Sequence, residues 1–373
     1  MGWRSRLLEP LAWSAQGFVA RGADPCVVAP REILVLRPSD LGDLLTTTPV
    51  FEALRRRFPA TRIVAAIGGW GRAVLEHNPF VDEVAALDLP WANKFVQDRS
   101  PRALLRFLAR SPQVAELRRR RGFDAGIDVT GSLAGVLTLM RLGARHRIGL
   151  RGYRGGSAGC QHSAAWTDRV HVAGTTLRQA ELLGAHDLPE ARPQLYLTPG
   201  EREDAARIWG PRRSGGAPRF LVSCGGGAEE KCWPAEDLGR ALRDMAAAMR
   251  ARWGESDLLL VGGPADRGRA ARVLAAEVPG LRSVCGETSL RSSFALAEQA
   301  DLVLTNASMM LHVAAAFRRP TVAVLGGMHS DPEGHDRLWG YPPPYASVGP
   351  AAPGAWPLPR AVVAAVMGAA GRH

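Results

Sequence analysis

The chain has 373 residues, enough for two domains, and its 46% hydrophobic and 22% charged residues are typical of a globular protein and exclude a largely disordered one. The formal net charge of +11 comes almost wholly from arginine, because Lys94 and Lys231 are the only lysines. The arginines are scattered without interleaved aromatic residues, so we attribute them to coding bias and expect no nucleic-acid partner.

Residues 1–31 form an N-terminal extension without the apolar core of a signal peptide. Two interpretations are open, an amphipathic segment at a membrane surface and a helix packed on the first domain, and we favour the packed helix. No apolar run in the chain reaches the roughly 18 residues that span a bilayer. We therefore expect a cytoplasmic protein with at most peripheral contact at the inner face of the membrane.

Residues 32–185 alternate apolar runs with helical patterns, which predicts an α/β domain. The strand-like runs are residues 32–38, 61–69, 123–131 and 146–150. The helical patterns between them cover residues 41–58, 71–77 and 132–144. Continuous apolar strands between helices indicate a parallel sheet covered on both faces, as in a Rossmann-like domain.

The composition changes over residues 186–218, which are rich in Pro, Gly and charge and which we interpret as a linker with one helix. Strand–helix alternation restarts at residue 219 and continues to about residue 350, so we predict a second doubly wound parallel sheet there. Residues 351–373 contain an apolar helical pattern that we expect to pack back on the first domain.

The second domain begins with a strand that runs into three glycines, Gly225, Gly226 and Gly227. Glycines at this place let backbone N–H groups approach a phosphate, and Lys231 adds a positive charge. The stretch matches neither a dinucleotide fingerprint nor a Walker loop. It predicts an anion site, and the alternative is a tight turn with an exposed lysine.

A second strand-to-helix junction, "TNASMMLHVAAA" (305–316), offers another place for an anion. Asn306 or Ser308 would cap the helix and leave its first N–H groups for the ligand. His312 lies one turn into the helix, where a packed or capping histidine is the simpler interpretation.

The turn "RPSDLGDLL" (37–45) places two acids where the first strand becomes a helix. Acids are favoured there by the helix dipole, and for Asp40 we prefer that explanation. A carboxylate of Asp43 at the carboxyl edge of the sheet would instead serve as a general base.

These motifs, in this order, resemble glycosyltransferase family 9, the heptosyltransferases that use ADP-heptose to build lipopolysaccharide core. The resemblance covers about residues 33–330 and includes "ILVLRPSDLGDLLTTTP", "GGGAEEKCWP", "LLLVGGPADRGRA" and "DLVLTNASMMLHVAAAF". It implies a GT-B fold, two facing Rossmann-like domains with a cleft between them, the acceptor on the first and the nucleotide sugar on the second. It also implies inverting catalysis with no metal or cofactor, only a nucleotide-sugar co-substrate that is ADP-linked.

By position, the resemblance assigns catalysis to Asp43, which matches the family's base. Lys231 matches the lysine that meets the donor diphosphate, and Gly225 to Gly227 match the loop beside it. Ser308 begins the helix near the phosphates, and His312 matches the histidine of the "DSGPMH" motif.

The nucleoside half of the donor site departs from the family in part. Thr288 lies where family members line the adenine pocket, but Arg267 lies where a ribose-binding acid is usual. Ala307 replaces the acid that normally contacts the donor sugar, a loss of roughly 1.5–3 kcal/mol for one charged hydrogen bond. We expect Asn306 to substitute in part.

The changed motif leaves several functions open. The sequence predicts transfer of a heptose or related sugar to the hydroxyl of an acceptor, either a glycolipid of lipopolysaccharide or, with an altered donor, a small natural product such as an antibiotic. A binding protein with a degenerate site is the alternative that Ala307 suggests. A nucleotide-sugar epimerase on the same two-domain architecture is a further alternative.

Overall fold

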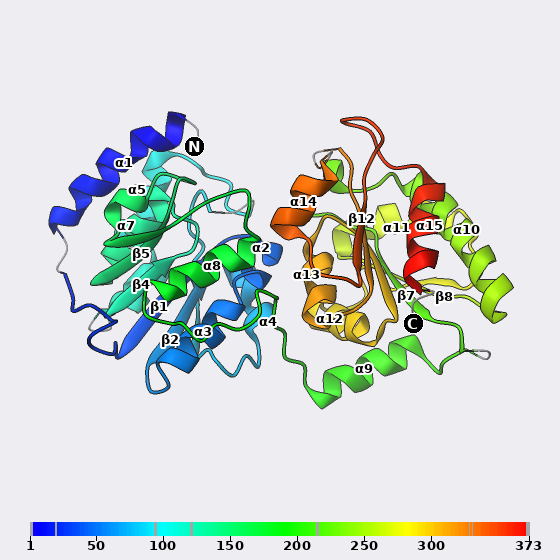
Figure 1. Ribbon diagram of the computed structural model, residues 1–373, viewed down its shortest axis with the longest axis horizontal. Helices are drawn as coiled ribbons and strands as arrows, with labels where there is room; N and C mark the ends of the chain where they lie inside the picture. The colour runs from blue at the N-terminus through cyan, green and yellow to red at the C-terminus, as the bar shows by residue number, and fades with distance from the viewer. Residues whose placement is uncertain are drawn as a thin grey trace. The chain divides into compact units, whose positions relative to one another are not determined.

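The computed structural model describes residues 3–18, 21–92, 95–119, 122–213, 216–327, 329 and 331–370. The chain divides into two compact units, Met1–Pro193 and Gln194–His373 (Figure 1). In the described residues each unit is a parallel six-stranded sheet with helices on both faces. This confirms the predicted α/β class with two doubly wound sheets, while their facing arrangement stays a prediction.

The first sheet has the strand order β3-β2-β1-β4-β5-β6. Its strands are β1 Glu32–Arg37, β2 Arg62–Ile67, β3 Glu83–Ala86, β4 Ala125–Asp128, β5 His146–Arg151 and β6 His162–Ala165. Central β1 pairs with β2 on one side and β4 on the other, and it is buried from Ile33 to Arg37. Burial on both faces explains why this strand is a continuous apolar run in the sequence.

Two layers of helices cover this sheet. The helices are α1 Trp3–Ala15, α2 Leu41–Leu45, α3 Pro49–Arg57, α4 Arg72–Leu75, α5 Pro101–Arg110, α6 Pro112–Arg118, α7 Leu133–Arg141 and α8 Val172–Glu181. Helices α3 and α8 pack on each other, and α7 packs on both α1 and α5. Ala12 of α1 is buried against Val136 and Met140 of α7, which confirms the favoured interpretation of a packed N-terminal helix.

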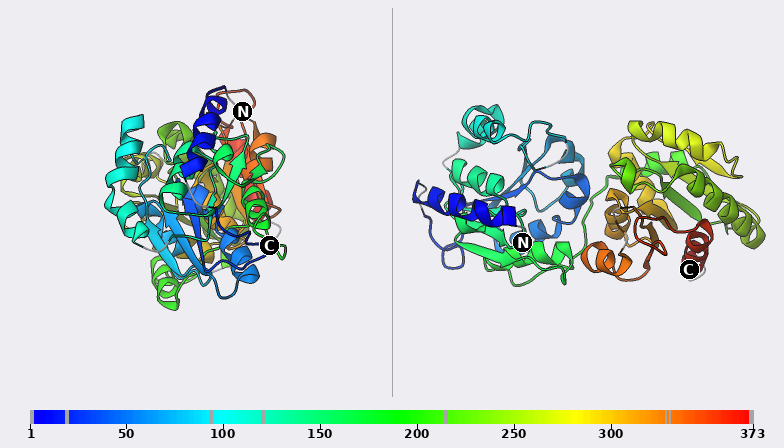
Figure 2. Two further views of the ribbon diagram at one scale, coloured as in Figure 1. Left: turned by 90° about the vertical axis from the view of Figure 1, so that its left-hand side faces the viewer. Right: turned by 90° about the horizontal axis from the view of Figure 1, so that it is seen from above.

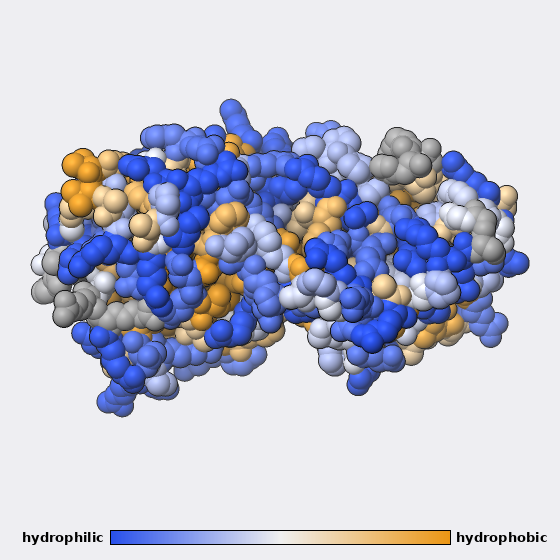
Figure 3. Space-filling view, turned by 90° about the horizontal axis from the view of Figure 1, so that it is seen from below, coloured by the Kyte–Doolittle hydropathy of each residue, from blue (hydrophilic) through white to orange (hydrophobic). Residues whose placement is uncertain are grey.

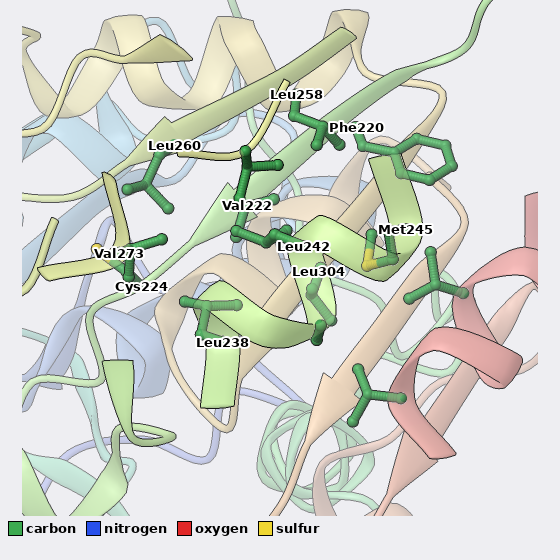
Figure 4. Close-up of a cluster of buried hydrophobic side chains, with 14 of the residues drawn as sticks. Phe220, Val222, Cys224, Leu238, Leu242, Met245, Leu258, Leu260, Val273 and Leu304 are labelled. Atoms are coloured by element: carbon green, nitrogen blue, oxygen red, sulfur yellow. The ribbon is translucent and has the colours of Figure 1, made fainter. Parts of the chain in front are cut away.

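The second sheet has the strand order β12-β11-β10-β7-β8-β9. Its strands are β7 Arg219–Ser223, β8 Asp257–Val261, β9 Leu281–Ser283, β10 Leu302–Asn306, β11 Thr321–Val324 and β12 Tyr345–Val348. Its helices are α9 Pro199–Trp209, α10 Ala235–Trp253, α11 Arg267–Leu274, α12 Leu290–Gln299, α13 Met309–Ala316, α14 Pro332–Trp339 and α15 Pro359–Ala370. Figure 4 shows the main core, in which side chains of β7 and β8 meet Leu238, Leu242 and Met245 of α10.

The structure corrects the expectation for the C-terminal helix. Helix α15 packs on α10 and on strands of the second sheet, and Val362, Val366 and Ala369 are part of that unit's core. The prediction that it returns to the first domain is wrong, because its apolar face completes the core of its own unit. Part of the predicted linker also belongs to the second unit, since α9 packs on α12.

The surface is mainly polar, as the charged composition requires. Figure 3 shows one face on which hydrophilic residues predominate and apolar residues form smaller areas. Across the described stretches, every helix is too short or too polar to cross a membrane. All five cysteines are free thiols, and four of them are buried.

Candidate functional site

Asp43 lies at the carboxyl edge of the first sheet, in the first turn of α2 directly after β1. The hydroxyls of Thr46 and Thr47 donate to its backbone carbonyl at 2.9 and 3.0 Å, which fixes the turn. Its side chain keeps 35% of its surface exposed. The structure therefore presents a carboxylate on a rigid turn with access from outside, as a general base requires.

Arg37, the last residue of β1, fixes the orientation of Asp43. Its Nη2 atom lies 3.4 Å from Oδ1 of Asp43, and its Nε donates to the Asp43 carbonyl at 3.3 Å. Arg37 itself is buried, with 8% exposure. Asp40 occupies the N-cap position of α2 but makes no capping hydrogen bond with its side chain.

Asp128, at the end of neighbouring β4, is a second acid at this edge and was not anticipated from the sequence. Its carboxylate accepts from the backbone N–H groups of Thr130 and Ser132 at 3.0 and 2.8 Å and from the Thr130 hydroxyl at 2.7 Å. Complete burial raises the pKa of Asp128 above its usual value, against the effect of these hydrogen bonds. Asp128 thus organises the loop after β4 and is closed to solvent.

In the second unit, the glycine loop (Gly225 to Gly227) follows β7 and packs against the Lys231 backbone and the Asp266 side chain. A Cβ atom at Gly226 would lie 2.9 Å from the Lys231 carbonyl oxygen, and one at Gly225 would lie 2.6 Å from the Asp266 carboxylate. Gly227 has a φ of 76°, in the left-handed region that favours glycine. The three glycines are thus required by close packing and backbone conformation.

Asn306, at the end of β10, joins this loop to the segment that carries Lys231. Its Nδ2 donates to the carbonyls of Cys224 and Gly225 at 3.1 and 3.2 Å, and its Oδ1 accepts from the Trp233 N–H at 2.9 Å. Asn306 is 4% exposed, so these bonds form inside the protein. Its amide therefore holds two loops together.

Arg269 of α11 holds the same segment from the other side. Its Nη1 donates to the Trp233 carbonyl at 3.1 Å, and its guanidinium forms an ion pair with Glu229. This pair lowers the pKa of Glu229 below its usual value. Lys231 therefore projects from a segment that is fastened at Glu229 and at Trp233.

The start of α13 lies beside this loop, because β10 and β7 are neighbours in the sheet. Ser308 is the N-cap residue of α13 without a capping bond from its side chain, and its hydroxyl lies 3.2 Å from that of Thr305. His312 is 6% exposed, and its Nδ1 lies 2.7 Å from the Tyr341 hydroxyl. These contacts describe a packed histidine, which was the simpler interpretation of the sequence. A role of His312 in binding phosphate stays a prediction.

The loop after β11 adds a histidine near Lys231 that the sequence did not single out. Burial, together with nearby His335 and Lys231, lowers the pKa of His329 to about 4, so its ring is neutral at pH 7. A Cβ at Gly327 in the same loop would lie 2.5 Å from the Glu230 carbonyl. The loop after β11 and the Lys231 segment are therefore in contact.

The residues predicted to bind the nucleoside, Arg267 and Thr288, follow β8 and β9, the two strands beyond β7 in the sheet. Nη2 of Arg267 donates to the Gly286 carbonyl at 2.7 Å, so Arg267 lies over the loop that leads to Thr288. The Thr288 hydroxyl is 3.4 Å from that of Ser293. Asp266, which the sequence analysis did not single out, accepts from the Gly263 N–H at 2.8 Å and is the acid next to Arg267.

All these strands are parallel, so the predicted diphosphate and nucleoside residues lie along one edge of the second sheet, after β10, β7, β8 and β9. In open α/β sheets, ligands bind at this edge, where the strand order reverses. The arrangement offers backbone N–H groups, a lysine and a helix start to an anion, with an acid one strand away. Within the described residues, no group of three or more His, Cys, Asp and Glu could hold a metal ion.

Comparisons with known proteins show the family of the chain. Residues 114–334, more than half of the chain, match the family model described as glycosyltransferase family 9 (heptosyltransferase). The chain is 26% identical over 317 residues to lipopolysaccharide heptosyltransferase 2 of Escherichia coli strain K12, covering 80% of this chain and 84% of that protein.

Solved structures show the same fold. The structure titled E. coli ADP-heptose lps heptosyltransferase II has a TM-score of 0.69 and 22% identity, covering 91% of this chain and 99% of that one. E. coli heptosyltransferase WaaC with ADP has a TM-score of 0.67 and 16% identity, covering 91% of this chain and 98% of that one. From the family match over residues 114–334, this chain belongs to glycosyltransferase family 9 and is a heptosyltransferase-like glycosyltransferase.

Proposed function

We propose that the protein transfers a heptose or a related sugar from an ADP-linked donor to a hydroxyl of an acceptor, with inversion and without a metal. The observation that carries this proposal is the link made by Asn306 between the glycine loop, the Lys231 segment and the end of β10. A relative named lipopolysaccharide heptosyltransferase 2 and a neighbour solved with ADP support the choice of donor.

In the donor half, fixed positive groups receive the leaving diphosphate. Lys231 contributes a full charge, and the N–H groups of Gly225 to Gly227 and of the start of α13 contribute partial charges. These groups are held before the reaction, by Asn306 and Arg269, so little reorganisation is needed as charge develops. They supply the stabilisation that a bound cation would otherwise provide.

In the acceptor half, Asp43 removes the proton from the acceptor hydroxyl as its oxygen forms a bond with the anomeric carbon. The bond from that carbon to the diphosphate breaks in the same step, and ADP leaves. Attack opposite the leaving group inverts the anomeric centre. Arg37 keeps the Asp43 carboxylate oriented through the 3.4 Å contact of their side chains.

The nucleoside half of the site is assigned as follows. Thr288 and Arg267 border the base and ribose, and Asp266 takes the role of the ribose-binding acid that is missing at Arg267. Asn306 positions the loops in place of contacting the sugar, because its amide already donates to two backbone carbonyls.

The wall beside the donor sugar differs from that of the family's usual motif. Ala307 packs with Leu311 and Tyr341 in a small apolar cluster, so this wall offers no carboxylate to sugar hydroxyls. The same observation favours a second candidate function, the transfer of an altered donor sugar to a small natural product such as an antibiotic. Both functions use the same chemistry and differ in the donor sugar and the acceptor.

The test is a donor and acceptor panel with the purified protein. ADP-heptose at one hundred times its dissociation constant is expected to stabilise the folded protein by about 2.7 kcal/mol. UDP- and GDP-sugars at the same concentration are expected to stabilise it less. Transfer should persist in EDTA, and NMR of the product should show the inverted anomer. Loss of transfer in EDTA, retention of configuration, or binding without any transfer would each contradict the proposal.

A further inference from the structure

Helix α1 carries an apolar face that no part of the described chain covers. Leu7, Leu11 and Trp13 are 63%, 58% and 70% exposed, whereas Ala12 on the opposite side is fully buried. At 100° per residue, Trp13, Pro10, Ser14, Leu7 and Leu11 fall in that order on one arc of the helix. The Ser14 hydroxyl donates to the Leu11 carbonyl at 3.0 Å, so the large side chains of this face are apolar.

The acid of α1 is turned away from this face. Glu9 accepts from the Ser157 hydroxyl at 2.8 Å and from the Ala158 N–H at 2.6 Å, which fastens α1 to the body of the first unit. The exposed arc has no charged residue among the described side chains of α1. The helix is thus held in place by its inner side, and the described side chains of its outer side carry no charge.

Helix α5 provides positive charge in the same layer. Leu137 of α7 packs into the apolar clusters of both α1 and α5, and Figures 1 and 2 show the three helices on one side of the first sheet. The outer side of α5 exposes Arg102, Arg106 and Arg110 together with Leu105, and α5 has no acid. Apolar and basic residues therefore face outward from neighbouring helices.

We propose that this α1–α5 surface (Leu7, Leu11, Trp13, Leu105, Arg102, Arg106 and Arg110) docks the protein on an anionic lipid bilayer. Trp and Leu insert at the level of the headgroups, and the arginines attract anionic lipids. A second copy in a symmetric dimer would present the same three arginines, whose like charges disfavour that partner relative to anionic lipid. The inference does not depend on the sugar-transfer proposal.

The experiment is flotation of the full-length protein with vesicles, either pure phosphatidylcholine or phosphatidylcholine with one third phosphatidylglycerol. The wild type should float with the anionic vesicles, less with the neutral ones, and less again at high salt. Replacing Leu7, Leu11 and Trp13 together by Ser should weaken binding about a hundredfold. Replacing Arg102, Arg106 and Arg110 by Gln should weaken it about fivefold per arginine.

The matched control is Leu358→Ser in the second unit, where the leucine is 57% exposed. It should leave vesicle binding unchanged. Circular dichroism and thermal melting show that each variant is folded, which is expected because every substituted side chain is exposed. No flotation of the wild type, equal flotation of the triple Ser variant, or a dimer that this variant dissociates would overturn the proposal.

Discussion

The two units share one topology but present opposite chemistry at the same place. When the strands of each unit are numbered from its own first strand, both sheets have the order 3-2-1-4-5-6. At the reversal of strand order the first unit places acids, Asp43 after β1 and Asp128 at the end of β4. The second unit places glycines after β7 and Asn306 at the end of β10.

The difference lies in how the groups are held. Asp43 is a partly exposed side chain on a turn of α2, oriented by one arginine. The second unit instead uses buried side chains, Asn306 and Arg269, to hold loops of backbone N–H groups around Lys231. One fold thus presents an acid in one unit and a glycine loop with a lysine in the other, according to the residues at the ends of its first and fourth strands.

The largest effect is expected from Asp43→Asn, which keeps the shape of the side chain and removes the base. Transfer should fall by about 10²- to 10⁴-fold in a single-turnover assay. Asp40→Asn is the control, since Asp40 is an N-cap residue three positions earlier, and it should keep most of the rate. Equal losses in both variants would remove Asp43 from the mechanism.

Next in size is Lys231→Ala, which removes the full charge from the anion site. Calorimetry should record a loss of about ten- to a hundredfold in ADP affinity. Lys231→Arg should recover part of it, because the charge remains. Unchanged ADP affinity in the Ala variant would refute the phosphate role.

Asn306→Ala tests whether the buried amide holds the donor loops. It leaves the Trp233 N–H without its partner and should cost about 1–3 kcal/mol in urea unfolding. KM for the donor should rise as well. Asn78→Ala in the first unit, where the asparagine is 6% exposed, should lower stability with no change in KM, and a similar KM change there would contradict this role.

The last prediction concerns the acid stability of the second unit, where Glu201 and Arg291 lie. Hydrogen bonds from Arg291 lower the pKa of Glu201 to about 2. A carboxyl with a depressed pKa stabilises the folded state above its ordinary pKa, near 4.5, and this contribution is lost as pH falls toward 2. Glu201→Gln should therefore lower stability by about 2 kcal/mol at pH 7. Between pH 5 and 2, the melting temperature of the Gln variant should fall less than that of the wild type. Parallel curves of melting temperature against pH for the two proteins would contradict this.

The fold was predictable where burial produces a continuous apolar run. Central strands such as β1 and β10 are buried on both faces and stand out in the sequence. Edge strands β3 and β12 have only four partly exposed residues each, so no apolar run marks them. The partner of α15 could not be deduced either, because an apolar helix face does not identify which core it completes.

The motifs of the candidate site could be found in the sequence, but the hydrogen bonds that hold them in place could not. The glycine loop and Lys231 are contiguous in the sequence, and their chemistry follows from residue type. The bonds of Asn306 and Arg269 to the Trp233 backbone join residues 73 and 36 positions apart. Asp266 lies beside Gly225 only because β7 and β8 are neighbours in the sheet.

The division of labour between the two units is tested most directly by ADP affinity of two variants measured side by side. Calorimetry with Asp43→Asn should give a dissociation constant close to that of the wild type, whereas Lys231→Ala should bind ADP at least tenfold more weakly. The reverse pattern, weak binding in the Asn variant and full affinity in the Ala variant, would contradict the account.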